Sequence, residues 1–409
     1  MTPNDRNIIR DLAFRVAEVA ADPIQDERRE LWRAQNALRP IRPLIFISPE
    51  GSWIELVPEA SLQCQDDDAR GIERGLRQRL YAQEHFHDDT VCDADFRIGK
   101  ALRGTGWGVG ETIIRPEESR GAYVWDAPIK TRADLEALTP PTVTVDEEAS
   151  ARNLAYYQDL FGDLLHVVFH NPCGGYALMD EWTRLRGITQ TFMDMSDDPQ
   201  LVHDGMRTLM EGHLARTESM LQQGIIGLNN GNDYVGSGSW GWSDELPQPD
   251  STGQVRFQDL WGFCTAQIMS EVSPAMHEEF VLRYEAPIAQ RFGLNIYGCC
   301  EPLHHKLDLL KRNIPRLRRV SISPWADKAT SAEQLGDRII FNWKPNPAAL
   351  AGVGFDEDWA REDIRETIAI CRANNCPLDI VMKDTHTCGQ QPWRFDRWAE
   401  IAREEVERS

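Results

Sequence analysis

Two stretches of the sequence are the most informative about the fold: Leu294-Asn-Ile-Tyr-Gly-Cys-Cys-Glu-Pro302 and Leu378-Asp-Ile-Val-Met-Lys-Asp-Thr-His-Thr-Cys-Gly389. Each starts with a short apolar run and passes directly into Gly, Cys, Pro or polar residues. A buried strand delivers side chains to the edge of a parallel sheet, or to the mouth of a barrel, in this way. We therefore expect Cys299 and Cys388 to lie at the carboxyl ends of two strands and to form one split site.

Further short apolar runs recur along the chain, separated by segments with helical spacing. They occupy residues 42–47, 164–170, 224–228, 319–323 and 338–342. Continuous apolar runs between helices predict parallel strands that are covered on both faces. The helix expected at 274–292 carries an apolar residue at every fourth position, as a helix packed on a sheet does. Because polar or ligand-capable residues follow nearly every run, the sequence predicts an α/β fold, a (β/α)8 TIM-type barrel.

The limits of this pattern set the expected domain organisation. Residues 1–41 are charged, with apolar positions at helical spacing, and predict an N-terminal helical extension packed on the main domain. Residues 42–409 then form the barrel. The stretch at about 50–130 mixes Gly, Trp and acidic residues without clean periodicity, so we expect an irregular insertion there.

Composition narrows the class of protein. The chain has 409 residues, 41% of them hydrophobic, and a formal net charge of −21, which argues against a general basic surface for nucleic acid or an anionic membrane. It has no run of eighteen apolar residues and no apolar signal core at its start. Nine cysteines, an odd number scattered over a long chain, fit a reducing compartment better than a disulfide framework. We expect a cytoplasmic enzyme.

The order of segments resembles the uroporphyrinogen decarboxylase superfamily and, within it, the cobalamin-linked methyltransferases. The motifs that carry the resemblance, besides the segments around Cys299 and Cys388, are Asp180-Glu-Trp-Thr-Arg-Leu-Arg-Gly187, Met195-Ser-Asp-Asp-Pro199 with Leu201, and Ser270-Glu-Val-Ser-Pro274-Ala-Met-His-Glu-Glu-Phe280. It covers roughly residues 150–409. The resemblance implies a barrel, and it implies methyl transfer between a small-molecule substrate and a corrinoid cofactor.

In the methyltransferase branch a zinc ion is held by a His-x-Cys strand end and by a later cysteine near the final strand. The matching positions here are Tyr297, Cys299 and Cys388, so the first histidine is missing. His386 is a replacement, because side chains two apart in an extended segment share a face. The resemblance therefore implies zinc on Cys299, His386 and Cys388, with an open coordination position.

Two alternatives stay open at this site. Cys300 or Glu301 can take the place of His386 as third ligand, and Cys299 and Cys300 can equally be two packed thiols in a core. A thiolate-bound zinc with an open position can turn a substrate thiol into a thiolate, or can polarise an ether oxygen so that its methyl group leaves toward Co(I). The sequence leaves the direction of transfer open.

The corrinoid is expected on a separate protein. Asp384-Thr-His386-Thr-Cys-Gly389 matches the Asp-x-His-x-x-Gly pattern that supplies a histidine to cobalt. Only twenty residues follow Gly389, however, whereas that pattern opens a domain of on the order of a hundred residues. We interpret the match as accidental.

Other strand ends supply candidate pocket residues. Tyr297, at the position of a family ligand, His170, at the end of an apolar run, and Glu301 are the candidate catalytic groups. Asn171, Asn229 and Asp233 also follow apolar runs and are the candidate substrate-binding groups, although Asn and Asp beside glycines also simply make turns.

The leading hypothesis is a zinc-dependent, corrinoid-linked methyltransferase. One alternative is a metal-free decarboxylase of the parent superfamily, but the chain has no counterpart of that family's arginine-rich N-terminal segment, which would neutralise porphyrin carboxylates. Another is a protein that binds a metal or corrinoid for a partner without catalysis.

Overall fold

The strands of the computed structural model form one large parallel sheet, described for residues 1–110, 112–115 and 123–409. Its six strands stand in the order β1-β12-β11-β10-β9-β8. Their bounds are β1 Leu44–Ile47, β8 Trp261–Cys264, β9 Leu294–Tyr297, β10 Leu317–Ile322, β11 Ile340–Trp343 and β12 Leu378–Met382. The predicted α/β class is confirmed, and every neighbouring pair in this sheet is parallel.

Beyond its two edge strands the sheet continues irregularly. Strand β2 (Asp95–Ile98) pairs in parallel with β7 (His166–Phe169), and single parallel bridges join Asn171 to Ile226 and Tyr176 to Cys264. Between these strands and bridges, side chains make hydrogen bonds to backbone groups that a neighbouring strand would otherwise bond. The hydrogen-bonded sheet is therefore not one continuous ring in the described part of the chain, although the arrangement is consistent with a TIM-type fold.

Both edge strands of the six-stranded sheet show this substitution of side chains for backbone. The amides of Ile45 and Ile47 in β1 donate to the carboxylates of Asp89 (2.8 Å) and Asp88 (2.9 Å). At the other edge, the Asn229 amide group bonds both the carbonyl (3.0 Å) and the N–H (2.9 Å) of Trp261. Polar side chains thus satisfy edge groups that would otherwise be buried without partners.

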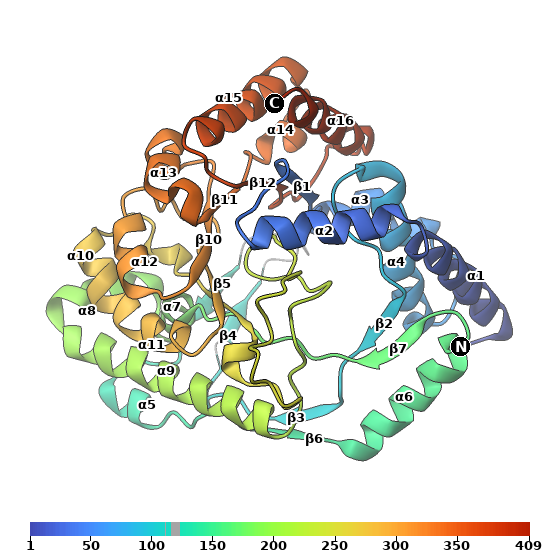
Figure 1. Cartoon of the computed structure of the whole chain (residues 1–409). Helices are drawn as coiled ribbons and strands as arrows, with labels where there is room; N and C mark the ends of the chain where they lie inside the picture. Colours follow the sequence, from blue (N-terminus) through green and yellow to red (C-terminus); the bar gives the residue numbers. More distant parts are fainter. Residues whose placement is uncertain (111, 116–122) are drawn as a thin grey trace.

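Helices surround the strands on the outside (Figure 1). The long ones are α1 Pro3–Ala20, α2 Ile24–Asn36, α4 Asp67–Tyr81, α6 Glu147–Phe161, α9 Pro199–Gln222, α15 Glu357–Ala373 and α16 Trp393–Arg408. The shorter ones are α3 Trp53–Leu56, α5 Arg132–Glu136, α7 Leu178–Arg186, α8 Ile188–Asp197, α10 Pro274–His277, α11 Arg283–Ala289, α12 Leu307–Asn313, α13 Lys328–Leu335 and α14 Ala348–Ala351. Two small antiparallel pairs, β3 (Leu102–Gly104) with β6 (Val143–Val145) and β4 (Thr112–Ile114) with β5 (Val124–Asp126), complete the chain.

The long connection from α9 to β8 passes through the middle of the ring of helices (Figure 1). It packs closely on the inner side of the sheet at two glycines with positive φ. A Cβ on Gly236 would lie 2.6 Å from Ile296 of β9, and one on Gly238 would lie 2.6 Å from Val381 of β12. Only glycine allows the chain to approach the strands so closely in this conformation.

A buried ion pair fixes the floor of this interior. Arg319 of β10 and Asp379 of β12 are fully buried, with Nε and Oδ2 2.7 Å apart. Gln35 of α2 donates to Asp379 (2.7 Å), Arg319 donates to Asn36 (2.7 Å), and Asn342 of β11 donates to Asp379 (2.9 Å). The second N-terminal helix, predicted as part of an extension, therefore ends inside the hydrogen-bond network of the strands.

The structure differs from the sequence prediction at short elements. Residues 224–228, predicted as a strand, contribute one isolated bridge, and β2 and β8 were not predicted. Helix 274–292 is present as α10, a π-helical turn (Glu278–Leu282) and α11. The predicted irregular insertion at about 50–130 contains α4 and strands β2 to β5. Within the described residues, every helix is too short or too polar to cross a membrane.

Replacing Asp379 with Ala leaves Arg319 buried without its counter-charge, and breaking such a pair typically costs about 3–5 kcal/mol. We expect Asp379→Ala to lower the free energy of unfolding by that amount in urea denaturation. Arg291→Ala is the matched control, because the Arg291–Glu218 pair is exposed and should be worth at most about 1 kcal/mol. Equal effects in the two variants would contradict the role given to the buried pair.

Candidate active site at the carboxyl ends of the strands

Cys299 follows β9 and lies at the carboxyl ends of the strands, as predicted. The turn between them depends on Gly298, which has φ +88° and whose Cβ, if present, would lie 2.4 Å from Leu303. This turn directs the side chains of Tyr297 and Cys299 to different surroundings. The Cys299 sulfur contacts the α9–β8 connection, whereas the Tyr297 hydroxyl contacts helices.

The Cys299 sulfur is surrounded by groups that stabilise a negative charge. Ser237 Oγ donates to it at 3.0 Å, the Cys300 thiol lies 3.4 Å away, and Lys383 Nζ lies 3.6 Å away. The hydrogen bond with Cys300, together with the Lys383 charge and the Ser237 hydroxyl, outweighs burial and lowers the pKa of the Cys299 thiol well below the usual range. Cys299 is therefore expected to be a thiolate at neutral pH.

The neighbouring Cys300 thiol stays protonated. Its single S–H is shared between the Cys299 sulfur (3.4 Å) and Asp384 Oδ2 (3.1 Å). The hydrogen bond with the Cys299 sulfur, burial and the negative charges of Cys299 and Asp384 raise the pKa of Cys300. The two adjacent cysteines thus divide into one thiolate and one thiol.

Lys383 supplies the positive charge of the site. It follows β12, and its ammonium group lies 3.0 Å from Asp384, 3.6 Å from Glu50 and 3.2 Å from the Ser237 hydroxyl. Burial alone would lower its pKa, but the negative charges of Cys299, Asp384 and Glu50 raise it. Lys383 therefore stays a cation next to the sulfur.

A second lysine, Lys344, follows β11 and is also buried. Burial and the nearby Lys383 cation lower its pKa to about 7, and its amino group donates to Asn342 Oδ1. At neutral pH it exchanges a proton readily, as a general base or acid must. Sequence reasoning missed both lysines, although each follows an apolar run directly.

Glu301 holds the Cys299 turn in place. Its carboxylate accepts hydrogen bonds from the Cys299 N–H (2.9 Å), the Thr265 hydroxyl (3.0 Å) and the Ala266 N–H (3.3 Å). The side chain is buried and ties the end of β9 to the end of β8. These contacts are those of a positioning residue; a direct catalytic role stays a prediction.

Tyr297 lies in the layer between the sheet and the helices, away from the predicted pocket position. Its hydroxyl donates to Glu285 Oε2 (2.8 Å) and lies 3.0 Å from His277 Nε2. Burial raises the pKa of the Glu285 carboxyl well above its usual value and lowers the pKa of His277 to about 3. Both shifts favour the neutral forms, and the three side chains form a buried polar core.

Cys388 and His386 lie after β12, but Cys388 has its own partner. The Cys388 thiol donates to Glu55 Oε2 at 3.0 Å, and the same oxygen accepts from the Cys388 and Gln390 N–H groups. Burial and the Glu55 hydrogen bond raise the pKa of this thiol to about 11. The His386 side chain is exposed.

The predicted zinc ligands do not fit a metal site in this arrangement. Among the residues that the structure describes, no three or more His, Cys, Asp or Glu side chains gather so that they could hold a metal ion. A lysine cation lies against the Cys299 sulfur, and Cys388 is a protonated donor to Glu55, whereas zinc needs thiolates free of competing cations. Zinc on Cys299, His386 and Cys388 stays a prediction of the sequence alone.

The remaining predicted residues divide into two kinds. His170 Nε2 and Asp233 Oδ1 lie 2.7 Å apart, and Arg97 reaches the same carboxylate at 3.5 Å. Asn171, by contrast, accepts from the Lys100 N–H (2.9 Å), and Asn229 serves the backbone of β8. The structure joins His170 to Asp233 and gives both asparagines backbone contacts; their binding roles stay predictions.

A cavity of about 910 Å³ borders this site. Ser48 and Pro49, at the end of β1, line it, and Glu50, which contacts Lys383, is the next residue. The Tyr234 ring packs edge-on against Phe46 and Trp240, and both of these rings line the cavity. The thiolate group and the cavity therefore share the end of β1 as a common border.

Comparison with known proteins gives fold relatives among solved structures. No protein-family model and no curated protein matches the chain. Among solved structures, a methyltransferase from Methanosarcina mazei is similar with a TM-score of 0.51 and 11% sequence identity, over 93% of this chain and 98% of that one. At this identity the similarity shows a shared fold.

The buried carboxyl of Glu285 predicts a specific pH dependence of stability. Because its folded pKa lies well above the unfolded value of about 4.3, the folded state holds a proton that the unfolded state loses, and stability falls as pH rises from there toward the folded pKa. Glu285→Gln removes this pH-dependent contribution to the free energy of unfolding, because the amide does not titrate. Urea denaturation should show the Gln variant gaining stability relative to the wild type between pH 4 and pH 8; a constant difference across this range would contradict the assignment.

Proposed function

We propose that the chain is a methyltransferase for a small-molecule substrate, built on a (β/α)8-type barrel, with the Cys299 thiolate as its nucleophile. The observation that carries the proposal is the position of the Cys299 sulfur. It lies at the carboxyl ends of parallel strands, between the Ser237 hydroxyl and the Lys383 cation. Catalytic groups of barrel enzymes gather at this end. The shared fold with the methanogen methyltransferase supports the same class of reaction.

The site supports nucleophilic displacement at a methyl carbon. The thiolate uses its electron pair to form the S–CH3 bond, the bond from carbon to the substrate heteroatom breaks, and the heteroatom leaves with that electron pair. The hydrogen bond with Cys300 and the Lys383 cation favour the ionised sulfur before the step. Lys344, with a pKa of about 7, is the residue proposed to protonate a basic leaving group.

We further propose that a corrinoid carried by a separate protein is the second methyl carrier. The support is the resemblance of the segments at 180–187, 195–201 and 270–280 to cobalamin-linked methyltransferases. A zinc ion would add Lewis-acid polarisation where thiolates hold it, but the described arrangement of Cys299, His386 and Cys388 does not fit one. Metal content of the purified protein, measured by elemental mass spectrometry, tests the zinc prediction separately.

The function is tested by methyl transfer from methylcobalamin to a panel of small thiols, and by the reverse transfer to cob(I)alamin from methylated amines, ethers and thioethers. The cobalt absorbance spectrum is followed with wild type, Cys299→Ser and Cys388→Ser. We expect transfer by the wild type and a loss of at least about a hundredfold in Cys299→Ser, because a hydroxyl is not ionised at neutral pH.

Cys388→Ser is the matched control and should retain most of the rate, since its thiol is a hydrogen-bond donor to Glu55. Equal loss in both variants, with circular dichroism unchanged, would instead favour the split zinc site. Unchanged transfer in Cys299→Ser would contradict the proposed nucleophile. Failure of every methyl donor and acceptor, with corrinoid binding retained, would favour a non-catalytic binding protein.

A further inference from the structure

The cavity beside β1 is lined by both aromatic and charged side chains. None of these side chains has a role in the proposed reaction. Five aromatic rings from five different segments of the chain line the cavity: Phe46, Trp53, Phe96, Tyr157 and Trp240. Four carboxylates lie among them, at Asp67, Asp68, Asp93 and Asp95, together with two guanidinium groups at Arg79 and Arg97. The charged side chains of the lining therefore carry an excess of negative charge.

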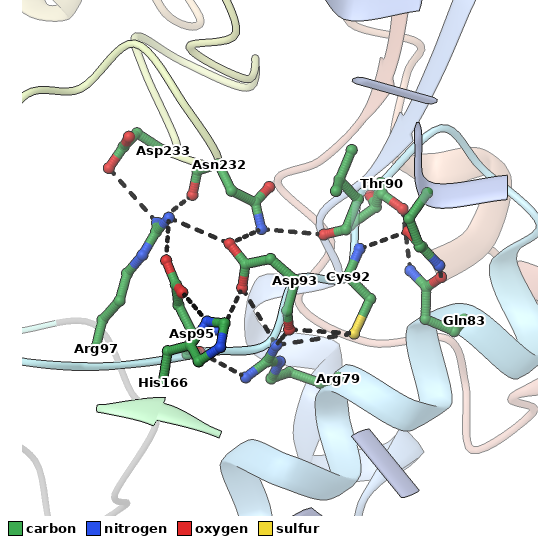
Figure 2. A network of polar contacts seen from close by, with 12 residues as sticks. Arg79, Gln83, Thr90, Cys92, Asp93, Asp95, Arg97, His166, Asn232 and Asp233 are labelled. Atoms are coloured by element: carbon green, nitrogen blue, oxygen red, sulfur yellow. Dashed lines mark hydrogen bonds and ion pairs between the residues drawn. The ribbon is translucent and has the colours of Figure 1, made fainter. Parts of the chain in front are cut away.

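Both guanidinium groups are already engaged by carboxylates (Figure 2). Arg79 lies 3.4 Å from Asp93, and Arg97 lies 3.2 Å from Asp93, 3.5 Å from Asp233 and 3.7 Å from Asp95. Asp93 also accepts from the Asn232 amide at 3.0 Å. The positive charges of the lining are thus neutralised within the network. Asp67 and Asp68, in the exposed first turn of α4, add negative charge at the rim.

Two glycines keep the cavity open. Gly71 and Gly75 lie one turn apart on the face of α4 that lines it. A Cβ at either position would meet no atom within 4 Å, so the chain has room for side chains that it does not use. Glycine inside a helix lowers the stability of the helix relative to alanine. Two glycines on one face therefore indicate that this face is kept free for a reason other than helix stability.

Polar atoms at the wall lack partners. In the described part of the chain, Asn232 Oδ1 and Trp240 Nε1 are buried without a hydrogen-bond partner, and both residues line the cavity. Buried polar groups normally have partners. These two atoms are shielded from solvent, and one is an acceptor whereas the other is a donor, so the choice of ligand rests on the rings and charges of the lining.

We propose that this cavity binds a small organic cation of the N-methylated ammonium class, either quaternary or protonated. Such ions carry a diffuse positive charge on apolar methyl groups. Aromatic rings attract both the methyl groups and the charge, and carboxylates attract the charge. An inorganic cation would leave the rings unused, and an anion would face the excess carboxylates. The binding claim stands by itself; that the bound cation is the methyl donor rests on the proposed function.

The cavity lies near the proposed nucleophile, although the Cys299 sulfur is not part of its lining. Its border residues Ser48 and Pro49 precede Glu50, whose carboxylate lies 3.6 Å from Lys383, and Lys383 contacts the Cys299 sulfur. An N-methylammonium donor also supplies its own activated leaving group. When the thiolate takes the methyl group, the nitrogen keeps the electron pair of the broken bond and leaves as a neutral amine.

Choline is the probe, and isothermal titration calorimetry is the measurement, with the neutral isostere 3,3-dimethylbutan-1-ol as matched ligand at equal ionic strength. We expect choline to bind and the isostere to bind at least about tenfold more weakly, a difference of about 1.4 kcal/mol. Gly75→Leu fills the cavity without a helix-propensity cost and should abolish binding. Asp95→Asn should weaken choline and leave the isostere unchanged.

Two variants away from the cavity are the controls. Ala151→Leu places the same leucine side chain at an exposed position of α6, and Asp250→Asn removes one charge from an exposed loop. Both variants should bind choline as the wild type does. Choline binding that survives Gly75→Leu, or equal binding of choline and its isostere, would overturn the proposal. Cavity-dependent binding without methyl transfer would retain this site and reject the proposed function, whereas methyl transfer from other donors without ammonium binding would do the reverse.

Discussion

The buried ion pair between Arg319 and Asp379 is the interaction on which the rest of the structure depends. It joins β10 to β12 across β11, and further hydrogen bonds of the pair reach the end of α2 and, through Asn342, the carbonyl of Gly238. The α9–β8 connection is therefore held against the inner side of the sheet. Because Ser237 precedes Gly238 directly, the same network that fixes the floor of the interior also presents a hydroxyl to the Cys299 sulfur.

The site next to this network contains buried positive charge, although the chain as a whole carries a formal net charge of −21. Lys344 and Lys383 are buried at the ends of β11 and β12, but their pKa values shift in opposite directions. Burial and the Lys383 cation lower the pKa of Lys344, whereas the Cys299 thiolate raises the pKa of Lys383. The low dielectric of the interior amplifies both effects. One small group of side chains thus offers a nucleophile, a fixed cation and a group that titrates near neutral pH, next to a cavity rich in aromatic rings.

The sequence predicted the long, regular elements because apolar periodicity is a local signal. Strands β9, β10 and β12 and the helices after residue 274 fall close to their expected positions, and Cys299 lies at a strand end as expected. The failures depend on contacts distant in sequence. Glu55 engages Cys388 across 333 positions. The positive φ of Gly298 breaks the strand alternation after Tyr297, so Tyr297 contacts Glu285 whereas Cys299 contacts Ser237. The 224–228 segment is apolar enough for a strand but pairs through one bridge and an amide side chain.

The central claim is that Cys299 is the nucleophilic thiolate and that the Cys300 hydrogen bond and the Lys383 cation together keep it ionised. The most direct measurement is peptide mass spectrometry after brief exposure to deuterated methyl methanesulfonate over a pH series, in the wild type and in Lys383→Met. The account predicts that the methyl label enters Cys299 ahead of the other cysteines at pH 7 and below, and that Lys383→Met moves this reactivity to higher pH. Label distributed according to exposure, or a pH profile of Cys299 unchanged by Lys383→Met, would contradict it.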